Sequence, residues 1–195
     1  MTDNPFVSED FDVPEQKSRY MKFEQGDNKF RLLEKPIVGW MWWEREEGLV
    51  KQSGDKPLPG DKPVRIKNDE NAKEEAMSVA RRFWAMVVWN YQTEAVEILE
   101  ITQRGIQKSI NALARSKDWG SPFDYDIVIE REGEKLETTY SVRPSPKKEL
   151  KKEIKETYKE AEIKIEALYK GEDPFAKELS IKEKEVDEIF DDVKK

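Results

Sequence analysis

The feature that most constrains the fold of this chain is the crowding of tryptophan into two short stretches. Five of the six tryptophans lie in residues 37–44 and 82–91, which read IVGWMWWE and RFWAMVVWNY. Aromatic and β-branched residues favour strands, so both stretches are predicted to be extended. Side chains alternate across a strand, so Trp40 and Trp42 share one face while Trp43 points to the other. A small barrel cannot bury both faces equally, so some of these rings should be exposed.

The second stretch divides its side chains between two faces in the same way. Met86 and Val88 share the parity of Trp84, and we assign this set to the core. The opposite parity, which we assign to an exposed groove, comprises Phe83, Trp89 and Tyr91. The alternative interpretation is that all of these aromatic side chains lie in the core.

The predicted elements follow in the order strand region, hairpin, helix, hairpin. Residues 45–62 are rich in glycine and proline and predict a loop, whereas 69–82 fits either a short helix or a loop. A five-stranded Greek-key barrel with one helix between its third and fourth strands is the OB-fold arrangement. We therefore predict a mainly β chain with an OB-fold, and a plain β-sandwich is the alternative. The predicted strands are 28–35, 37–44, 63–67, 82–91, 95–102, 123–132 and 135–144, and the helix lies around Ile106, Ile110 and Leu113.

Composition divides the chain into four segments. Residues 1–18 and the acidic tail 171–195 are expected to be disordered, and 19–146 holds all six tryptophans and forms the OB-fold domain. Residues 147–170 predict one amphipathic helix, because apolar residues recur at three- and four-residue spacing. That apolar stripe comprises Leu150, Ile154, Ala161, Ile165 and Leu168. The sequence does not decide whether the stripe packs on the barrel or on a second chain.

The net charge of −7 is concentrated at the two ends of the chain. Residues 1–19 hold five acids and two bases, and 171–195 hold nine acids and five bases. Residues 147–170 hold eight bases and six acids, which leaves 20–146 with a net charge of −2. A nearly neutral core between acidic ends can carry a basic groove.

Two missing residue types exclude several classes of protein. The chain has no cysteine and no histidine, which excludes disulfides and zinc fingers and removes most nucleophile and general-base patterns. We therefore predict no metal, no cofactor and no enzymatic activity. A nuclease built on carboxylates is the remaining enzymatic alternative, but its Glu-x-Lys spacing is missing beside the alternating acids of 124–132.

The chain also lacks the marks of a membrane or exported protein. No apolar run approaches the roughly 20 residues that a membrane span needs. The acidic N-terminus has no apolar segment of the kind found in signal peptides. These absences predict a cytoplasmic protein, in the host cytoplasm if the chain is viral.

Basic residues stand beside the aromatic strands in sequence. Exposed rings stack on the bases of a single strand, and arginine or lysine beside them contacts the phosphates. Lys108 lies on the predicted helix, whose basic residues fit either a solvated face or a phosphate contact. The resulting candidate set for nucleic acid is Arg31, Trp40, Trp42, Trp43, Arg65, Lys67, Arg81, Arg82, Phe83, Trp84, Trp89, Tyr91 and Lys108.

Three stretches of the sequence resemble one known family. They are NKFRLLEKP, RRFWAMVV and GIQKSINAL, followed by WGSPFDYDIVIEREG, in the same order as in the helix-destabilising single-stranded-DNA-binding proteins of tailed bacteriophages. The resemblance is to the T-even type and covers roughly residues 25–145. It implies an OB-fold and sequence-independent binding of single strands in phage DNA replication, recombination and repair.

The resemblance also points to Arg81, Arg82, Phe83 and Trp84 at the DNA cleft, whereas strand parity places Trp84 inside. The sequence departs from the family in two ways. It cannot form the Cys and His zinc module of the best-known members, so 45–77 must be built differently as a zinc-less variant. Its N-terminus is acidic where those members have a basic segment for cooperative assembly.

The acidic tail is the candidate site for protein partners. Apolar anchors stand among its carboxylates, and the residues concerned are Val186, Ile189, Phe190, Asp191 and Asp192. In proteins of this kind such a tail recruits replication or recombination proteins and competes with DNA; the alternative is a merely solubilising tail. Two other functions stay open, an OB-fold adaptor that self-associates through 147–170 and a single-stranded-RNA binder.

Overall fold

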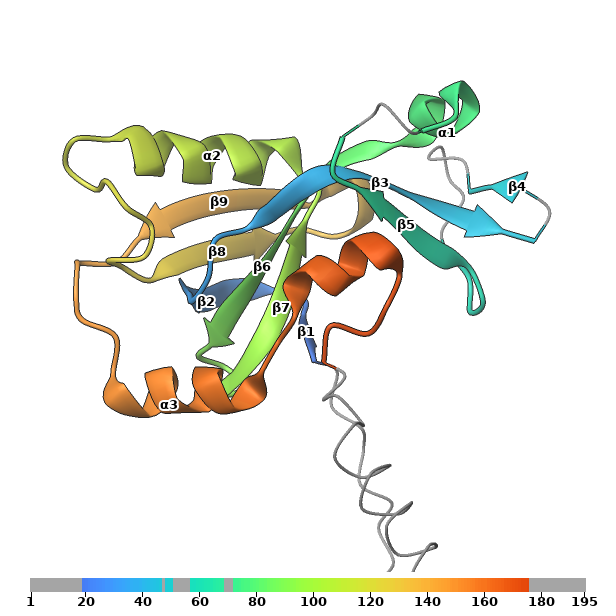
Figure 1. The fold of residues 1–195 in the computed structure, drawn as a ribbon. Helices are drawn as coiled ribbons and strands as arrows, with labels where there is room; N and C mark the ends of the chain where they lie inside the picture. Colours follow the sequence, from blue (N-terminus) through green and yellow to red (C-terminus); the bar gives the residue numbers. More distant parts are fainter. Residues whose placement is uncertain (1–18, 47, 51–56, 69–71, 176–195) are drawn as a thin grey trace, which may run out of the picture.

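The chain folds into one mixed β-sheet with helices on both of its faces (Figure 1). The computed structural model describes residues 19–46, 48–50, 57–68 and 72–175. The strands are β1 (Tyr20–Met21), β2 (Gly26–Leu32), β3 (Ile37–Arg45), β4 (Gly48–Leu49), β5 (Lys62–Ile66), β6 (Arg81–Asn90), β7 (Ala95–Ile101), β8 (Ile127–Glu132) and β9 (Thr139–Pro144). The α-helices are α1 (Glu74–Val79), α2 (Arg104–Arg115) and α3 (Lys152–Ala161), and the 3-10 helices are η1 (Lys135–Glu137) and η2 (Ile165–Lys170).

The strand order along the sheet is β1-β7-β6-β2-β8-β9, and β3 branches from β6 to pair with β5 and β4. The pairing of β1 with β7 is parallel, and the other pairings are antiparallel. The prediction of a mainly β fold with a C-terminal helix is confirmed. The predicted barrel would close by joining β7 to β9, but in the described part of the chain β7 pairs with β1 and the sheet is open.

Strand β6 organises the whole sheet because it changes partners along its length. Its first half, from Arg81 to Ala85, pairs with β3, and its last residues, Val88 to Asn90, pair with β2. Strands β2 and β3 are consecutive, and Pro36 stands between them. A proline has no N–H to donate to a ladder, so it interrupts the long strand, and β2 and β3 pair with separate stretches of β6. Beyond Met41, β3 no longer pairs with β6, and the hairpin that it forms with β5 extends away from the rest of the sheet (Figure 1).

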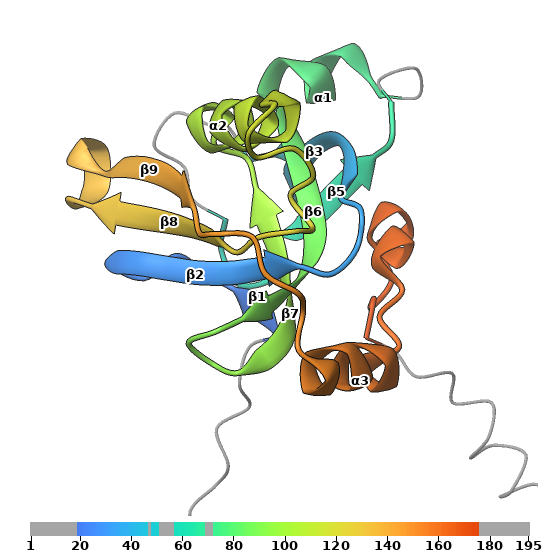
Figure 2. The same cartoon turned by 90° about the vertical axis from the view of Figure 1, so that its left-hand side faces the viewer.

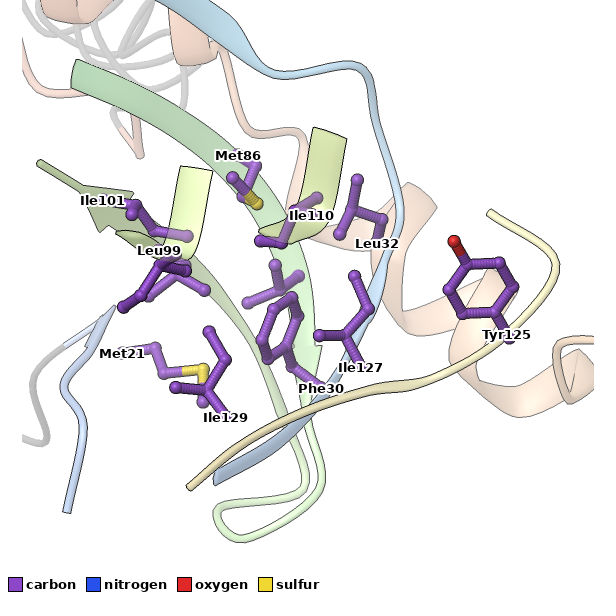
Figure 3. Close-up of a cluster of buried hydrophobic side chains, with 12 residues drawn as sticks. Met21, Phe30, Leu32, Met86, Leu99, Ile101, Ile110, Tyr125, Ile127 and Ile129 are labelled. Atoms are coloured by element: carbon purple, nitrogen blue, oxygen red, sulfur yellow. The ribbon is translucent and has the colours of Figure 1, made fainter. Parts of the chain in front are cut away.

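One apolar core lies on the inner face of β6, between the sheet and α2 (Figure 3). Ile110 points from α2 into this cluster, and Ile106 joins it one turn earlier. Met86 and Val88 are buried in the cluster, and Trp84 packs against it half-buried. The assignment of this parity to the core is therefore confirmed, and the ring of Trp84 stands at the rim of the core.

A second apolar core lies on the opposite face of β6 and β7. Phe83, which we expected in an exposed groove, is fully buried there, so that prediction is wrong. The physical reason is that η2 covers the strand, with Tyr169 edge-on to the Phe83 ring at 6.2 Å between centroids. The sheet contributes Met41, Ala85, Val87, Val96 and Ile98 to this core, and the C-terminal segment contributes Ile165, Leu168 and Phe175.

The C-terminal segment that covers this face is shorter in helix than predicted. Instead of one helix over 147–170, the chain forms α3 and then η2, separated by a left-handed residue, Glu162, with φ of 46°. Ile154, Ile165 and Leu168 of the predicted stripe are buried. The stripe packs on the sheet of its own chain, and the two views in Figures 1 and 2 show α3 and η2 along β7 and the β3–β5 hairpin.

The two described ends of the chain meet beside this second core. Tyr20 of β1 lies edge-on to Phe175 at 5.6 Å, and the Arg19 guanidinium lies 3.8 Å from the centre of the same ring. Of the segments predicted to be disordered, 1–18 and residues 176–195 of the tail 171–195, with Val186 to Asp192, lie outside the described residues. Residues 171–175 are ordered instead, because Phe175 is buried in the second core. Among the described helices, none combines the length and the apolar character that a membrane crossing requires.

Candidate nucleic-acid interface

Cross-strand pairing brings four side chains to one face of the sheet, which we call the Trp40 face and define as Val38, Trp40, Arg82 and Trp84. In the β3–β6 ladder Val38 is opposite Trp84, and Trp40 is opposite Arg82. Residues directly opposite in an antiparallel pair project from the same side of the sheet. Val38 is 45% exposed, which is unusual for a large apolar side chain in a strand, and both tryptophans are half-buried.

Within this face an arginine stacks on a tryptophan. The guanidinium carbon of Arg82 lies 4.5 Å from the centre of the Trp40 ring, within the range of a cation–π contact. Arg82 is exposed, so its charge faces solvent while its planar group covers one side of the indole. A flat ring next to an exposed cation is the combination that holds a base and its phosphate.

The absence of a side chain at Gly39 lets β5 approach β3 closely beside Trp40. A Cβ at Gly39 would stand 1.9 Å from the backbone oxygen of Ile66, so no other residue fits without moving β5. Ile66 is the direct partner of Trp40 in the β3–β5 ladder, and Lys67 follows it, exposed.

Helix α2 is tied to the same place by one side chain. Gln107 Nε2 donates to the backbone oxygens of Ile101, at 2.8 Å, and Arg82, at 3.3 Å. Arg104 and Lys108 are exposed on the same flank of α2, because residues four apart lie on one side of a helix. Two further exposed cations thus stand on the helix that Gln107 ties to the start of β6.

Four predicted contact residues are buried, which corrects their assignment. The structure gives Arg31 1%, Arg65 7%, Trp42 7% and Phe83 0% exposure. Both arginines form internal ion pairs, with Arg31 Nη1 at 3.0 Å from Asp126 and Arg65 Nη2 at 2.7 Å from Glu100. The Trp42 indole donates to Glu44 at 2.9 Å. These four side chains are therefore not part of the exposed aromatic and basic face that the sequence predicted.

Three other predicted residues lie on the face opposite to the Trp40 face. Arg81 is exposed beside Arg82 but has the other parity, and Trp43 and Trp89 are half-buried against the second core. Trp43 lines a groove of about 930 Å³ between the β3–β5 hairpin and η2. Its charged lining is Lys62, Arg65, Lys170, Glu44, Glu100, Glu172 and Asp173. Since carboxylates outnumber cations there, this groove is a poor place for a phosphate backbone.

Tyr91 belongs to a polar network on the outer side of β2, around Asp126. Asp126 has no exposed surface, and it accepts hydrogen bonds from Arg31 at 3.0 Å and from the Tyr91 hydroxyl at 2.9 Å. Lys148 Nζ lies 2.8 Å and Lys29 Nζ 3.2 Å from its other oxygen. Burial opposes the charged form of Asp126, but the hydrogen bonds from Lys148, Tyr91 and Lys29 outweigh burial and lower its pKa below 3.8.

The substitution Asp126→Asn should lower the free energy of unfolding at neutral pH by about 3–5 kcal/mol, because it leaves the buried Arg31 charge without a counterion. A carboxylate with a lowered folded pKa stabilises above its unfolded pKa, and this stability is lost as the pH falls through the folded pKa. Urea unfolding from pH 7 down to pH 2 should therefore show an acid-labile component that the Asn variant lacks. Asp27→Asn, in an exposed pair with Arg143, is the matched control. Equal losses in the two variants would contradict this account.

Sequence reasoning missed several residues of the interface and found others. Trp40, Arg82, Trp84, Lys67 and Lys108 were predicted, and the structure brings Trp40, Arg82 and Trp84 together. Arg104 belongs to the basic residues of the predicted helix, for which a solvated face and a phosphate contact both stayed open. Val38, Gly39 and Gln107 were missed; the alternation of Val38 with Trp40 along β3 was the available signal for the first. In the described ranges no group of three or more acidic side chains lies close enough to hold a metal ion. Comparisons of the chain with family models, with curated proteins and with solved structures gave no match.

Proposed function

We propose that this chain binds single-stranded DNA without sequence specificity and without catalysis, through the Trp40 face. The observation that carries the proposal is the exposed Arg82 guanidinium stacked on Trp40, with Trp84 on the same face. Helix α2, which carries the exposed Arg104 and Lys108, is bonded to Arg82 O through Gln107. Base stacking on an aromatic ring contributes about 1–3 kcal/mol per base and does not depend on which base it is. The cations supply the phosphate contacts, which are also independent of sequence.

The proposal includes an OB-fold ancestry for the sheet. Taken together, β2 and β3 pair with β6 and with β8, β6 pairs with β7, and β8 pairs with β9, with α2 between β7 and β8. These are the neighbours of an OB-fold in which the first strand is long and broken, here at Pro36. The join between the third and fifth strands is replaced by the parallel pair of β1 and β7. The Trp40 face lies where the broken first strand diverges.

Single strands suit this face better than duplex DNA. The rings of Trp40 and Trp84 lie within a sheet and next to a helix flank, and a paired base has no free face to offer them. In the wider proposal the protein coats single strands during phage DNA replication, recombination and repair. A coiled-coil adaptor function has less support, because the apolar side chains Ile154, Ile165 and Leu168 are used within the chain.

Intrinsic tryptophan fluorescence tests the proposal directly. Oligo-dT should quench the emission, since bases that stack on Trp40 and Trp84 provide a relaxation path, and duplex DNA of the same length should quench little. The logarithm of the binding constant should fall with the logarithm of the salt concentration, with a slope of about −0.7 for each phosphate contacted. Equal titrations with oligo-U distinguish an RNA binder. Absence of any response to oligo-dT at low salt would refute the proposed function.

A further inference from the structure

A second cluster of cations lies away from the Trp40 face, at the corner where β2 ends. A shallow groove of about 680 Å³ is bounded there by the end of β2, the loop before β8 and the segment that leads into α3. Its cationic lining, which we call the basic corner, comprises Arg31, Lys147, Lys148 and Lys155. Asp124 and Glu149 also line it, so cations outnumber carboxylates by two to one.

The basic corner has more positive charge than its buried carboxylate can balance. Asp126 is shared by Arg31, Lys29 and Lys148, all within 3.2 Å of its oxygens. Arg31 is only 1% exposed, and its Nε has no hydrogen-bond partner among the described residues. Three cations on one carboxylate leave an excess of positive charge, and an anion at the corner would relieve their mutual repulsion.

The backbone holds the lysines of the basic corner in place. Ser145 N donates to Asp126 O at 2.8 Å, and Lys148 N donates to Asp124 O at 3.0 Å. Arg31 Nη2 also donates a hydrogen bond to Lys148 O. Lys147 therefore sits on a segment clamped at both sides, while its side chain is exposed and forms no ion pair with a described residue. Lys155, in the first turn of α3, is also exposed and also forms no ion pair with a described residue.

An aromatic ring accompanies these cations. The ammonium groups of Lys29 and Lys148 lie 5.0 and 5.2 Å from the centre of the Tyr91 ring, which is half-buried. The corner thus repeats, with lysines and a tyrosine, the combination of ring and cation found on the Trp40 face. Arg31 pairs with Trp89 across the β2–β6 ladder and points away from the inner core, so the corner lies on the opposite face of the sheet.

We propose that the basic corner is a second contact for the same nucleic-acid strand and binds its phosphates. This inference rests on the proposed function. A strand held only at the Trp40 face needs few nucleotides, whereas one that also reaches Lys147 and Lys155 must pass round the junction of β2 and β3. We therefore expect the basic corner to raise the binding affinity only for longer strands, through the attraction between its lysines and the phosphates.

The test is the double substitution Lys147→Gln with Lys155→Gln, measured with a series of oligo-dT lengths at several salt concentrations. For long oligomers the slope of log K against log salt should become shallower by about 1.4, since each single-strand phosphate contact contributes about 0.7. Short oligomers should bind the variant and the wild type equally. The matched control is Lys151→Gln with Lys159→Gln, which removes the same charge from exposed lysines outside the groove lining and should leave the slope less changed.

The possible outcomes separate this inference from the proposed function. One outcome is that oligo-dT quenches the tryptophan emission of the wild type while the two double variants show the same slope of log K against log salt at every oligomer length. That result would show that the basic corner does not contact the strand. If wild type does not bind oligo-dT, the proposed function fails and the corner contact fails with it. In that case inorganic phosphate alone is added to the protein and the backbone NMR signals of Lys147 and Lys148 are followed. A shift of these signals would assign the corner to a free anion and overturn the strand contact.

Discussion

A chain that ends at Lys148 should lose its cooperative unfolding transition, even though it keeps every strand of the sheet. The truncation removes Ile154, Ile165, Leu168 and Phe175, each less than 9% exposed. Burying one such side chain contributes about 1.5–3 kcal/mol, so the four together approach the 5–15 kcal/mol by which a typical domain is stable. The truncation would also expose Phe83 and the apolar strand face around it.

Polar contacts reinforce this docking of the C-terminal segment. The Tyr169 hydroxyl donates to Val38 O at 2.7 Å, which ties η2 to the strand that carries the Trp40 face. The Tyr158 hydroxyl donates to Glu34 at 3.0 Å. Burial, with the hydrogen bond to Glu34 and its charge, raises the pKa of Tyr158 to about 12. The hydroxyl is therefore protonated and able to donate at neutral pH.

Thermal and urea unfolding, followed by circular dichroism, measure the effect of the truncation. The matched control is a chain that ends at residue 176, which retains all the described core residues and should unfold at the midpoint of the full chain. The chain that ends at Lys148 should show no folded baseline or a midpoint far below it. Equal midpoints for the two truncated chains would contradict the structural role of α3 and η2.

The inner core of the fold was predictable from the sequence because it depends on local alternation. The parity of Trp84, Met86 and Val88 predicted which side of β6 faces the core, and the spacing of Ile106 and Ile110 predicted the helix that covers it. Both patterns are read within a dozen residues. The strands flanking Pro36 were predictable for the same reason.

The outer face of β6 was not predictable, because its cover comes from far along the chain. Phe83, Ala85 and Val87 alternate as well as the inner set, and alternation cannot tell an exposed groove from a face buried by a later segment. The stripe of 150–168 fitted a second chain as well as this sheet. The packing of η2 on β5 and β6 decides between them.

In the candidate site, too, the sequence predicted local features but not contacts between residues far apart in the chain. The sequence showed that Arg31 and Arg65 stand near aromatic strands, but their ion-pair partners, Asp126 and Glu100, are 95 and 35 positions away along the chain. Long-range partners of this kind leave no local pattern. Arg82 and Trp40 are also distant in sequence, and only the strand register makes them neighbours.

Trp40→Ala should weaken binding of oligo-dT by roughly 5- to 150-fold, which corresponds to the 1–3 kcal/mol that one stacked base contributes. Trp40 is half-buried, carries Arg82 on its ring and lies opposite it in the ladder. Removing the indole takes away the stacking surface and also frees the arginine. Trp43→Ala is the matched control, because Trp43 is also half-buried on the same strand but projects from the opposite face.

A pair of adjacent arginines separates the effect of position from that of charge. Arg81 and Arg82 are both exposed, and they differ in the face of β6 from which they project. Either substitution to glutamine changes the net charge equally. Loss of affinity in Arg82→Gln that exceeds the loss in Arg81→Gln therefore reports a contact at the Trp40 face, rather than a general change of electrostatic potential.

The most direct test of the account is the affinity of Trp40→Ala for a fluorescently labelled oligo-dT, measured by anisotropy beside Trp43→Ala and wild type at one salt concentration. Circular dichroism of all three proteins checks that the fold is kept. The account predicts a large loss of affinity in Trp40→Ala and wild-type affinity in Trp43→Ala. Unchanged affinity in Trp40→Ala, or a greater loss in Trp43→Ala, would show that the strand does not bind at the Trp40 face.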